Sequence, residues 1–311
     1  MSANRPVTNR PGRLATWGAL LIVYVIWGST YLGIRVVAES LPAFGSAAMR
    51  FGSAGVLLAV ILAAVRGVRR LRISWRQLAG TTVVGILLLV GGNGLVVLAE
   101  SPRFAVPSGV AALVISLNPL IMVVLRAATG DRPGLLTVLG VAVGLAGLAA
   151  LFLPGLAGAS DHPVPIVGGL LCLAAVTCWC VGSFATRWLP MPEDAFVASV
   201  YEMFAGAIAM ALIAVARSEP VPWLVPHVPA RAWIALAYLV VFGSLLAFTA
   251  YIWLLHHAPI SLVSTYAYVN PVIALLLGAL LVNEVLTSQV LVAAATVVVG
   301  VVLVVSTERV R

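Results

Sequence analysis

The chain has 311 residues, of which 62% are hydrophobic and only 9% are charged. This composition excludes most soluble enzymes, disordered chains and fibrous repeats, because too little polar surface is left to cover a water-soluble globule. The net charge of +8 is the balance between 18 basic residues, all of them Arg, and 10 acidic residues. We attribute it to the loops of a membrane protein and not to nucleic-acid binding.

Ten apolar stretches follow one another, each long enough to cross a bilayer as a helix. They are apolar on every face, which excludes the alternating pattern of barrel strands. The sequence therefore predicts an all-α integral membrane protein with ten transmembrane helices and with tails at 1–13 and 306–311. The expected helices cover 14–34, 43–65, 78–98, 104–126, 134–153, 164–187, 195–216, 231–254, 260–282 and 286–305.

The distribution of Arg between these stretches predicts the orientation, because cytoplasmic loops carry the excess of positive charge. With the N-terminus inside, 13 Arg lie in inner segments, 4 lie in outer loops and Arg50 lies within a helix. We therefore expect a multi-pass protein of the cytoplasmic (inner) membrane with both termini in the cytoplasm.

An internal repeat with an offset of 152 residues relates the two halves of the chain. The halves, 14–153 and 164–305, hold five stretches each, and an odd number gives them opposite orientations in the membrane. Such inverted repeats are typical of secondary transporters, which bind substrate near the bilayer midplane between the repeats. The matched residues are Trp27 and Trp179, Arg35 and Arg187, Phe44 and Phe196, Pro107 and Pro259, and the pairs Asn118-Pro119 and Asn270-Pro271.

Several motifs point to a known family: "IWGSTYLGIRVV" in the first stretch, "SAAMRF" in the second, "PSGVAALVISLNPL" in the fourth and "PISLVSTYAYVNPVIALLLGALLVNEVLT" near the end. With the ten helices and the repeat, they make the chain resemble the EamA-type exporters of the drug/metabolite transporter superfamily. The resemblance implies export of amino acids or small metabolites without ATP hydrolysis, with stretches 1, 3, 4, 6, 8 and 9 lining a cavity. One departure is Asp131-Arg132, where the second half has Asn283-Glu284.

Aromatic and hydroxyl residues share one face of the first helix, because Trp27, Thr30 and Tyr31 stand at positions i, i+3 and i+4. Trp179 and Ser183 repeat this arrangement in the sixth helix. Ordinary packing and an aromatic belt at the membrane interface are the alternatives, but Trp27 lies past the middle of its stretch. We interpret these five residues as substrate-binding candidates.

Polar residues in three other stretches extend the candidate site. Asn93 lies mid-span in the third stretch, where an amide avoids lipid unless it bonds to something. Thr265 and Tyr268 share a polar face of the ninth stretch. We expect all three side chains to contact substrate, although close helix packing is the alternative.

The two Asn-Pro pairs also lie mid-span. Pro119 and Pro271 each remove a backbone hydrogen bond, so we expect both helices to kink and we interpret the prolines as hinges. Asn118 and Asn270 are substrate-binding candidates, and hydrogen bonding to a neighbouring helix is the alternative role.

Arg50 and Glu202 are the only charged residues well inside a stretch, and they correspond under the repeat. Charge within the membrane is a functional hypothesis by default. For Arg50 we favour a side chain that snorkels to the interface, whereas Glu202 should be protonated or paired. Both residues are candidates for coupling transport to protons.

A face of small residues, Gly140, Gly144 and Gly147, lies on the fifth stretch. It predicts close contact either with the tenth helix or with a second subunit, which would make a homodimer.

The sequence predicts neither a metal site nor a cofactor. The adjacent His256 and His257 project to different faces, and no nucleophile–base pair or phosphate-binding loop is apparent. We therefore expect a transporter and not an enzyme, with a small-molecule substrate, membrane lipid around it and no nucleic-acid partner. The alternative function is a lipid-handling (flippase-like) or structural membrane subunit.

Overall fold

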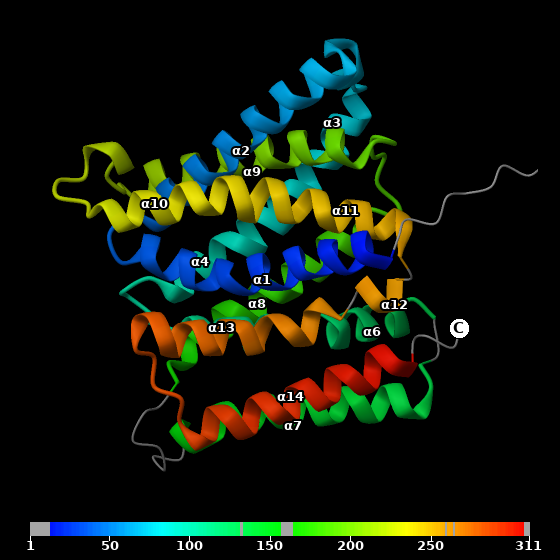
Figure 1. Ribbon diagram of the computed structural model, residues 1–311, viewed down its shortest axis with the longest axis vertical. Coiled ribbons are helices and arrows are strands. Elements are labelled where there is room, and N and C mark those ends of the chain that lie inside the picture. Colours follow the sequence, from blue (N-terminus) through cyan, green and yellow to red (C-terminus); the bar gives the residue numbers. More distant parts are fainter. Residues whose placement is uncertain (1–12, 131–132, 157–163, 259, 264, 308–311) are drawn as a thin grey trace, which may run out of the picture.

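In the computed structural model, every regular element of the described segments is a helix, and turns and loops connect these helices (Figure 1). These segments are residues 13–130, 133–156, 164–258, 260–263 and 265–307. The residues Asp131 and Arg132 and most of both expected tails lie outside them.

In these segments nine helices are long and apolar enough to cross a membrane, and Tyr266–Val282 is a shorter apolar helix. The elements begin and end within a few residues of the expected stretches, because long apolar runs with proline or polar residues at their ends are a strong local signal. The ninth stretch is divided, which leaves its main helix short. In chain order the elements are α1 (Arg13–Ala38), α2 (Ala43–Arg66), η1 (Val68–Leu71), α3 (Trp75–Gly85), η2 (Ile86–Gly94), α4 (Leu95–Glu100), α5 (Ser108–Ile115), α6 (Asn118–Ala128), α7 (Leu135–Leu156), α8 (Ile166–Ala185), α9 (Ala195–Ala216), η3 (Pro222–Leu224), α10 (Ala230–Tyr238), η4 (Leu239–Leu246), α11 (Ala247–His257), α12 (Ile260–Val263), α13 (Tyr266–Val282) and α14 (Ser288–Thr307).

Two of the long helices change to π-helix in the middle. The segment η2 connects α3 to α4, and η4 connects α10 to α11. Their first residues, 86 and 239, are 153 positions apart, which is close to the offset of the sequence repeat. A π-segment widens the helix and is frequent at functional sites, so both halves carry the same irregularity at equivalent places.

Carboxylates from distant loops cap two helix N-termini. Glu219 accepts hydrogen bonds from two backbone N–H groups in the first turn of α2, both at 3.0 Å. Glu284 does the same in the first turn of α5, at 2.7 and 3.2 Å. A negative charge at a helix N-terminus satisfies free N–H groups and interacts favourably with the helix dipole. The loop after α13 is thereby attached to α5.

The helices α7 and α14 lie side by side at one end of the molecule (Figure 1). The glycine face of α7 forms this contact: a Cβ added at Gly140 would lie 3.0 Å from the carbonyl oxygen of Gly300, and one at Gly147 would lie 2.8 Å from Val297. Of the two partners considered for this face, the structure shows the tenth helix, α14.

Candidate functional site

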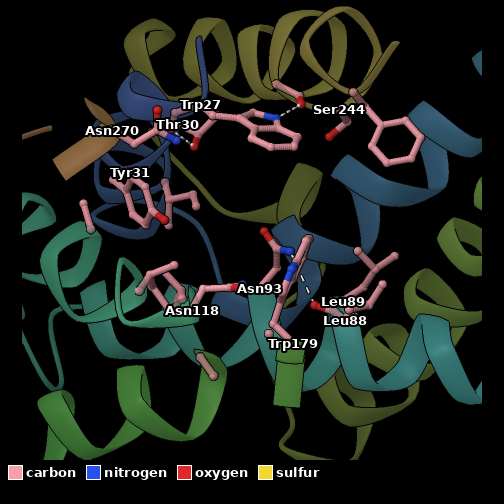
Figure 2. Close-up of a pocket in the computed structure, with 18 of the residues that line it drawn as sticks. Trp27, Thr30, Tyr31, Leu88, Leu89, Asn93, Asn118, Trp179, Ser244 and Asn270 are labelled. Atoms are coloured by element: carbon pink, nitrogen blue, oxygen red, sulfur yellow. Dashed lines mark hydrogen bonds between the residues drawn. The ribbon is translucent and has the colours of Figure 1, made fainter. Parts of the chain in front are cut away.

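A cavity of about 210 Å³ is lined by residues from both halves of the chain (Figure 2). Every long helix in the described segments contributes to the lining except α7 and α14, and α13 contributes as well. The two π-segments supply Leu88, Leu89, Gly92 and Asn93 from η2, and Gly243 and Ser244 from η4. The helices α2 and α9 are additions to the six expected from the family resemblance.

The structure brings ten of the fourteen candidate residues together in this lining. Ser183, Thr265, Tyr268 and Pro119 lie outside it. The ten are Trp27, Thr30, Tyr31, Arg50, Asn93, Asn118, Trp179, Glu202, Asn270 and Pro271.

The side chain of Trp27, in the first half of the chain, contacts residues of the second half. Its indole Nε1 donates to the carbonyl oxygen of Gly243 in η4, at 3.3 Å. Its ring lies 5.0 Å from that of Tyr251 and 5.3 Å from that of Tyr266, centroid to centroid. On the next turn, the hydroxyl of Thr30 donates to the carbonyl oxygen of Trp27 at 2.6 Å. These contacts fix the indole at the cavity wall.

Trp179 and Asn93 lie on the other side of the cavity from Trp27 (Figure 2). The amide nitrogen of Asn93 donates to the carbonyl oxygen of Leu88, five residues earlier within η2, at 3.5 Å. The amide of Asn93 therefore has a partner inside its own π-segment, while the residue still lines the cavity.

Both Asn-Pro pairs lie close to helix interruptions. In the first half α5 ends at Ile115 and α6 begins at Asn118, with Pro119 in its first turn. In the second half the break precedes α13, and Pro271 lies inside that helix. Two turn residues therefore separate α5 from α6 just before Pro119, within one membrane-length segment, whereas Pro271 lies inside a continuous helix.

The Asn of each pair connects neighbouring helices. The thiol of Cys180 in α8 lies 3.5 Å from the carbonyl oxygen of Asn118. The amide of Asn270 is placed so that its nitrogen can donate to the carbonyl oxygens of Tyr266 and Tyr24, both at 3.3 Å. Asn270 thus reaches α1 as well as the cavity.

Arg50 does not snorkel, and that expectation is wrong. Only 6% of the residue is exposed, and its Nε donates to the hydroxyl of Ser244 at 3.1 Å. Its guanidinium also lies 4.8 Å from the centre of the Phe51 ring. Because η4 supplies a polar partner within the bundle, the side chain turns inward instead of toward the interface.

Glu202 on α9 also lines the cavity, and no ion pair joins it to Arg50. The two charges that correspond under the repeat therefore face the same cavity without neutralising each other directly.

The three substrate-binding candidates outside the lining have other surroundings. Thr265 is buried, and its hydroxyl bonds to that of Tyr24 and to the carbonyl oxygen of Leu262. Tyr268 and Ser183 are half-buried on α13 and α8. Placement on a shared helix face was not enough to predict which residues reach the cavity: Trp179 and Ser183 lie on the same continuous helix, α8, yet only Trp179 lines it.

Glu100 was missed in the sequence, because the third stretch was expected to end at residue 98. It is only 1% exposed, and neither carboxyl oxygen has a hydrogen-bond partner within the described segments. The Ser108 hydroxyl is likewise buried without a partner there. The signal that was available in the sequence is the position of Glu100 directly after an apolar run, as the last residue of α4 (Leu95–Glu100).

Comparison with known proteins identifies the family. The model of the EamA-like transporter family matches residues 16–153 and 166–306. The chain belongs to this family. The resemblance noted in the sequence is confirmed, and the chain is a membrane transporter by family and by its apolar helices.

Two relatives and one solved structure illustrate the similarity to EamA-like transporters. The chain is 36% identical over 293 residues to the uncharacterized inner membrane transporter YedA of Escherichia coli strain K12, covering 94% of this chain and 90% of YedA. It is 28% identical over 291 residues to a probable terminal-alkyne amino-acid exporter of Streptantibioticus cattleyicolor, covering 93% of each chain. A crystal structure at 24% identity has the same fold, with a TM-score of 0.63 over 96% of this chain and 100% of that one.

Proposed function

We propose that this chain is a secondary transporter that exports a small metabolite or amino acid across the cytoplasmic membrane by alternating access. Ten transmembrane helices would form two inverted five-helix repeats, 14–153 and 164–305, with both termini in the cytoplasm. The observation that carries the proposal is the cavity, whose lining contains corresponding residues from the two halves, such as Trp27 and Trp179 or Asn118 and Asn270.

The pattern of helix contacts supports the inverted repeats. The second helices of the halves, α2 and α9, pack against each other, as do the fifth helices, α7 and α14. The first helix of one half, α1, packs against α11 and α13 of the other, and α8 packs against α4, α5 and α6 in return. Exchanging the halves therefore reproduces the same set of contacts, as a pseudo-two-fold axis requires.

The size and lining of the cavity support a small substrate. About 210 Å³ is less than the ~300–1,000 Å³ of pockets for drug-sized ligands. The lining combines the rings of Trp27, Trp179 and Tyr31 with three asparagine amides. Such a lining fits a compound with an apolar body and few charged groups.

The helix irregularities support alternating access. Irregular helix geometry at membrane depth is tolerated where it lines a cavity, and the two residues between α5 and α6 and the π-segments η2 and η4 all lie beside this one. We assign Pro119 and Pro271 as hinges about which one half moves against the other. Trp27, Thr30, Tyr31, Asn93, Asn118, Trp179 and Asn270 are the proposed substrate contacts.

A two-stage experiment tests the function. A strain that overexpresses the chain is grown on a panel of toxic metabolites and amino-acid analogues, and the compound to which it becomes resistant is then loaded into proteoliposomes with the purified chain. We expect the single polypeptide to release that compound faster than empty liposomes do. A flippase-like or structural subunit predicts no such release without another chain.

A further inference from the structure

The guanidinium group of Arg50 is held in the wall of the cavity with part of its hydrogen-bonding capacity unused. Among its nitrogens, Nε donates to Ser244, whereas Nη1 is buried without a partner in the described segments. No carboxylate in these segments forms an ion pair with it. The ring of Phe51 contacts the guanidinium but offers no acceptor for its N–H groups.

A buried guanidinium without a counter-charge is unfavourable unless a bound molecule supplies one. Arg stays ionised in proteins, and an enclosed charge without a counter-charge is costly, as is an enclosed N–H without an acceptor. Ionisable groups inside membrane proteins accordingly mark sites for ligands or ions. A negatively charged acceptor on a molecule in the cavity would supply the missing counter-charge beside the guanidinium.

The surroundings of Arg50 indicate what the rest of that molecule looks like. Its partner Ser244 and the acceptor of the Trp27 indole, Gly243, are consecutive residues of η4. A Cβ added at Gly243 would lie 3.4 Å from Nη2 of Arg50 and 3.0 Å from Thr30, so glycine at this position lets the guanidinium approach. The guanidinium of Arg50 and the indole ring of Trp27 therefore both lie against the same turn of η4.

We propose that Arg50 binds a carboxylate group of the transported substrate, with Ser244 as a positioning residue and Trp27 against the apolar part of the molecule. This inference rests on the proposed transport function, and it specifies the substrate class as apolar monocarboxylates, including amino acids. Glu202 faces the same cavity, so a substrate with several negative charges would meet repulsion.

Matched acids and amides test the assignment on the purified full-length chain. The probes are L-phenylalanine with L-phenylalaninamide and hydrocinnamate with hydrocinnamamide, titrated while tryptophan fluorescence is recorded. We expect the wild type to bind at least one acid about tenfold or more tightly than its amide, because the charge-assisted bond to Arg50 requires the carboxylate. Arg50→Gln should bring that ratio close to one.

Three further variants separate binding from folding. Arg50→Lys keeps the charge but loses the planar fork, so it should retain part of the preference. Ser244→Ala should reduce the ratio partway, since it removes only the bond to Nε. Arg231→Gln is the matched control, because Arg231 is 68% exposed and pairs with Glu39 away from the cavity. The acid-to-amide ratio is measured on monodisperse protein, so a change in the folded fraction does not alter it.

Three results would overturn the inference: equal binding of acid and amide by the wild type, an unchanged ratio in Arg50→Gln, or no binding of either acid. If Arg50→Gln does not fold, the ratios of Arg50→Lys and Ser244→Ala decide, and a full preference in both rejects it. Export of a compound without a carboxylate would leave the proposed function standing and reject the role of Arg50. Absence of any transport from proteoliposomes would reject the function itself.

Discussion

Trp27 and Trp179 occupy corresponding positions in the two halves, but their surroundings differ. Trp27 is tied to η4 by its indole N–H and packs against Tyr251 and Tyr266. Trp179 lies across the cavity, beside Asn93 (Figure 2). The pair gives the cavity two aromatic surfaces on opposite sides, so an apolar substrate can contact both.

Replacing either tryptophan should therefore lower transport. We expect Trp27→Ala and Trp179→Ala to reduce release from proteoliposomes at least about tenfold, because each loses an aromatic contact with the substrate. Both side chains are half-buried, so their truncation also costs stability, up to the ~3–5 kcal/mol of a fully buried aromatic. Transport is therefore normalised to the folded protein recovered from the membrane.

Trp75→Ala provides the control, since Trp75 is 81% exposed and lies outside the lining. Normal transport by both cavity variants would contradict the assignment of the cavity as the substrate site.

Glu202 is the residue at which we place proton coupling, because it is a carboxyl group in the cavity wall that forms no ion pair within the described segments. Glu202→Gln mimics the protonated form and keeps the side-chain volume. We expect this variant to exchange substrate at equilibrium but to lose the acceleration that a pH gradient gives the wild type, measured in proteoliposomes.

The matched substitution Glu193→Gln, at an exposed position, should keep that acceleration. If wild-type transport itself does not respond to the gradient, the chain is a facilitator and coupling through Glu202 is rejected.

Among the elements, α7 and α14 differ from the rest because they pack mainly on each other and contribute nothing to the cavity lining. Their contact depends on glycine: a Cβ added at Gly300 would lie 2.7 Å from the carbonyl oxygen of Gly140. We interpret the pair as a structural support for the helices that surround the cavity.

Substituting this glycine should destabilise the protein. We expect Gly300→Ala to cost about 1–3 kcal/mol, because the added methyl group forces the two backbones apart, and to lower the thermal unfolding midpoint in detergent. Gly18→Ala is the control, since no atom outside its own helix turn would lie within 4 Å of the new Cβ. Equal midpoints for the two variants would show that the α7–α14 contact is not tight.

The whole molecule has a predicted orientation that follows from the 13-to-4 distribution of Arg between inner and outer segments. An alkaline phosphatase fused after Arg311 should be inactive, because the enzyme requires the oxidising exterior and the C-terminus is expected in the cytoplasm. A fusion after Pro229, in a loop expected outside, should be active. The reverse pattern would overturn the orientation.

Much of the architecture could be predicted from the sequence because it depends on local properties. Runs of apolar residues determined where helices lie, and the offset of 152 between Trp27 and Trp179 related the halves. The same repeat placed Asn118 and Asn270 at matching depths, and both line the cavity. The tryptophan and asparagine pairs of the repeat therefore pointed to the site, whereas the matched Arg and Phe pairs lie outside the lining.

The sequence by itself determined the class of the protein, its family and ten of the 27 residues that line its cavity, because apolar runs and residues repeated at a constant offset can be recognised in the sequence alone. Only the tertiary structure decided that Arg50 turns inward to Ser244, that Glu100 is buried and that the glycines of α7 meet α14. It also decided that η2 and η4 are π-helical. Each of these features depends on which helices are neighbours. The partner of a buried charge and the contact made by a glycine face belong to another helix, which the local sequence does not identify.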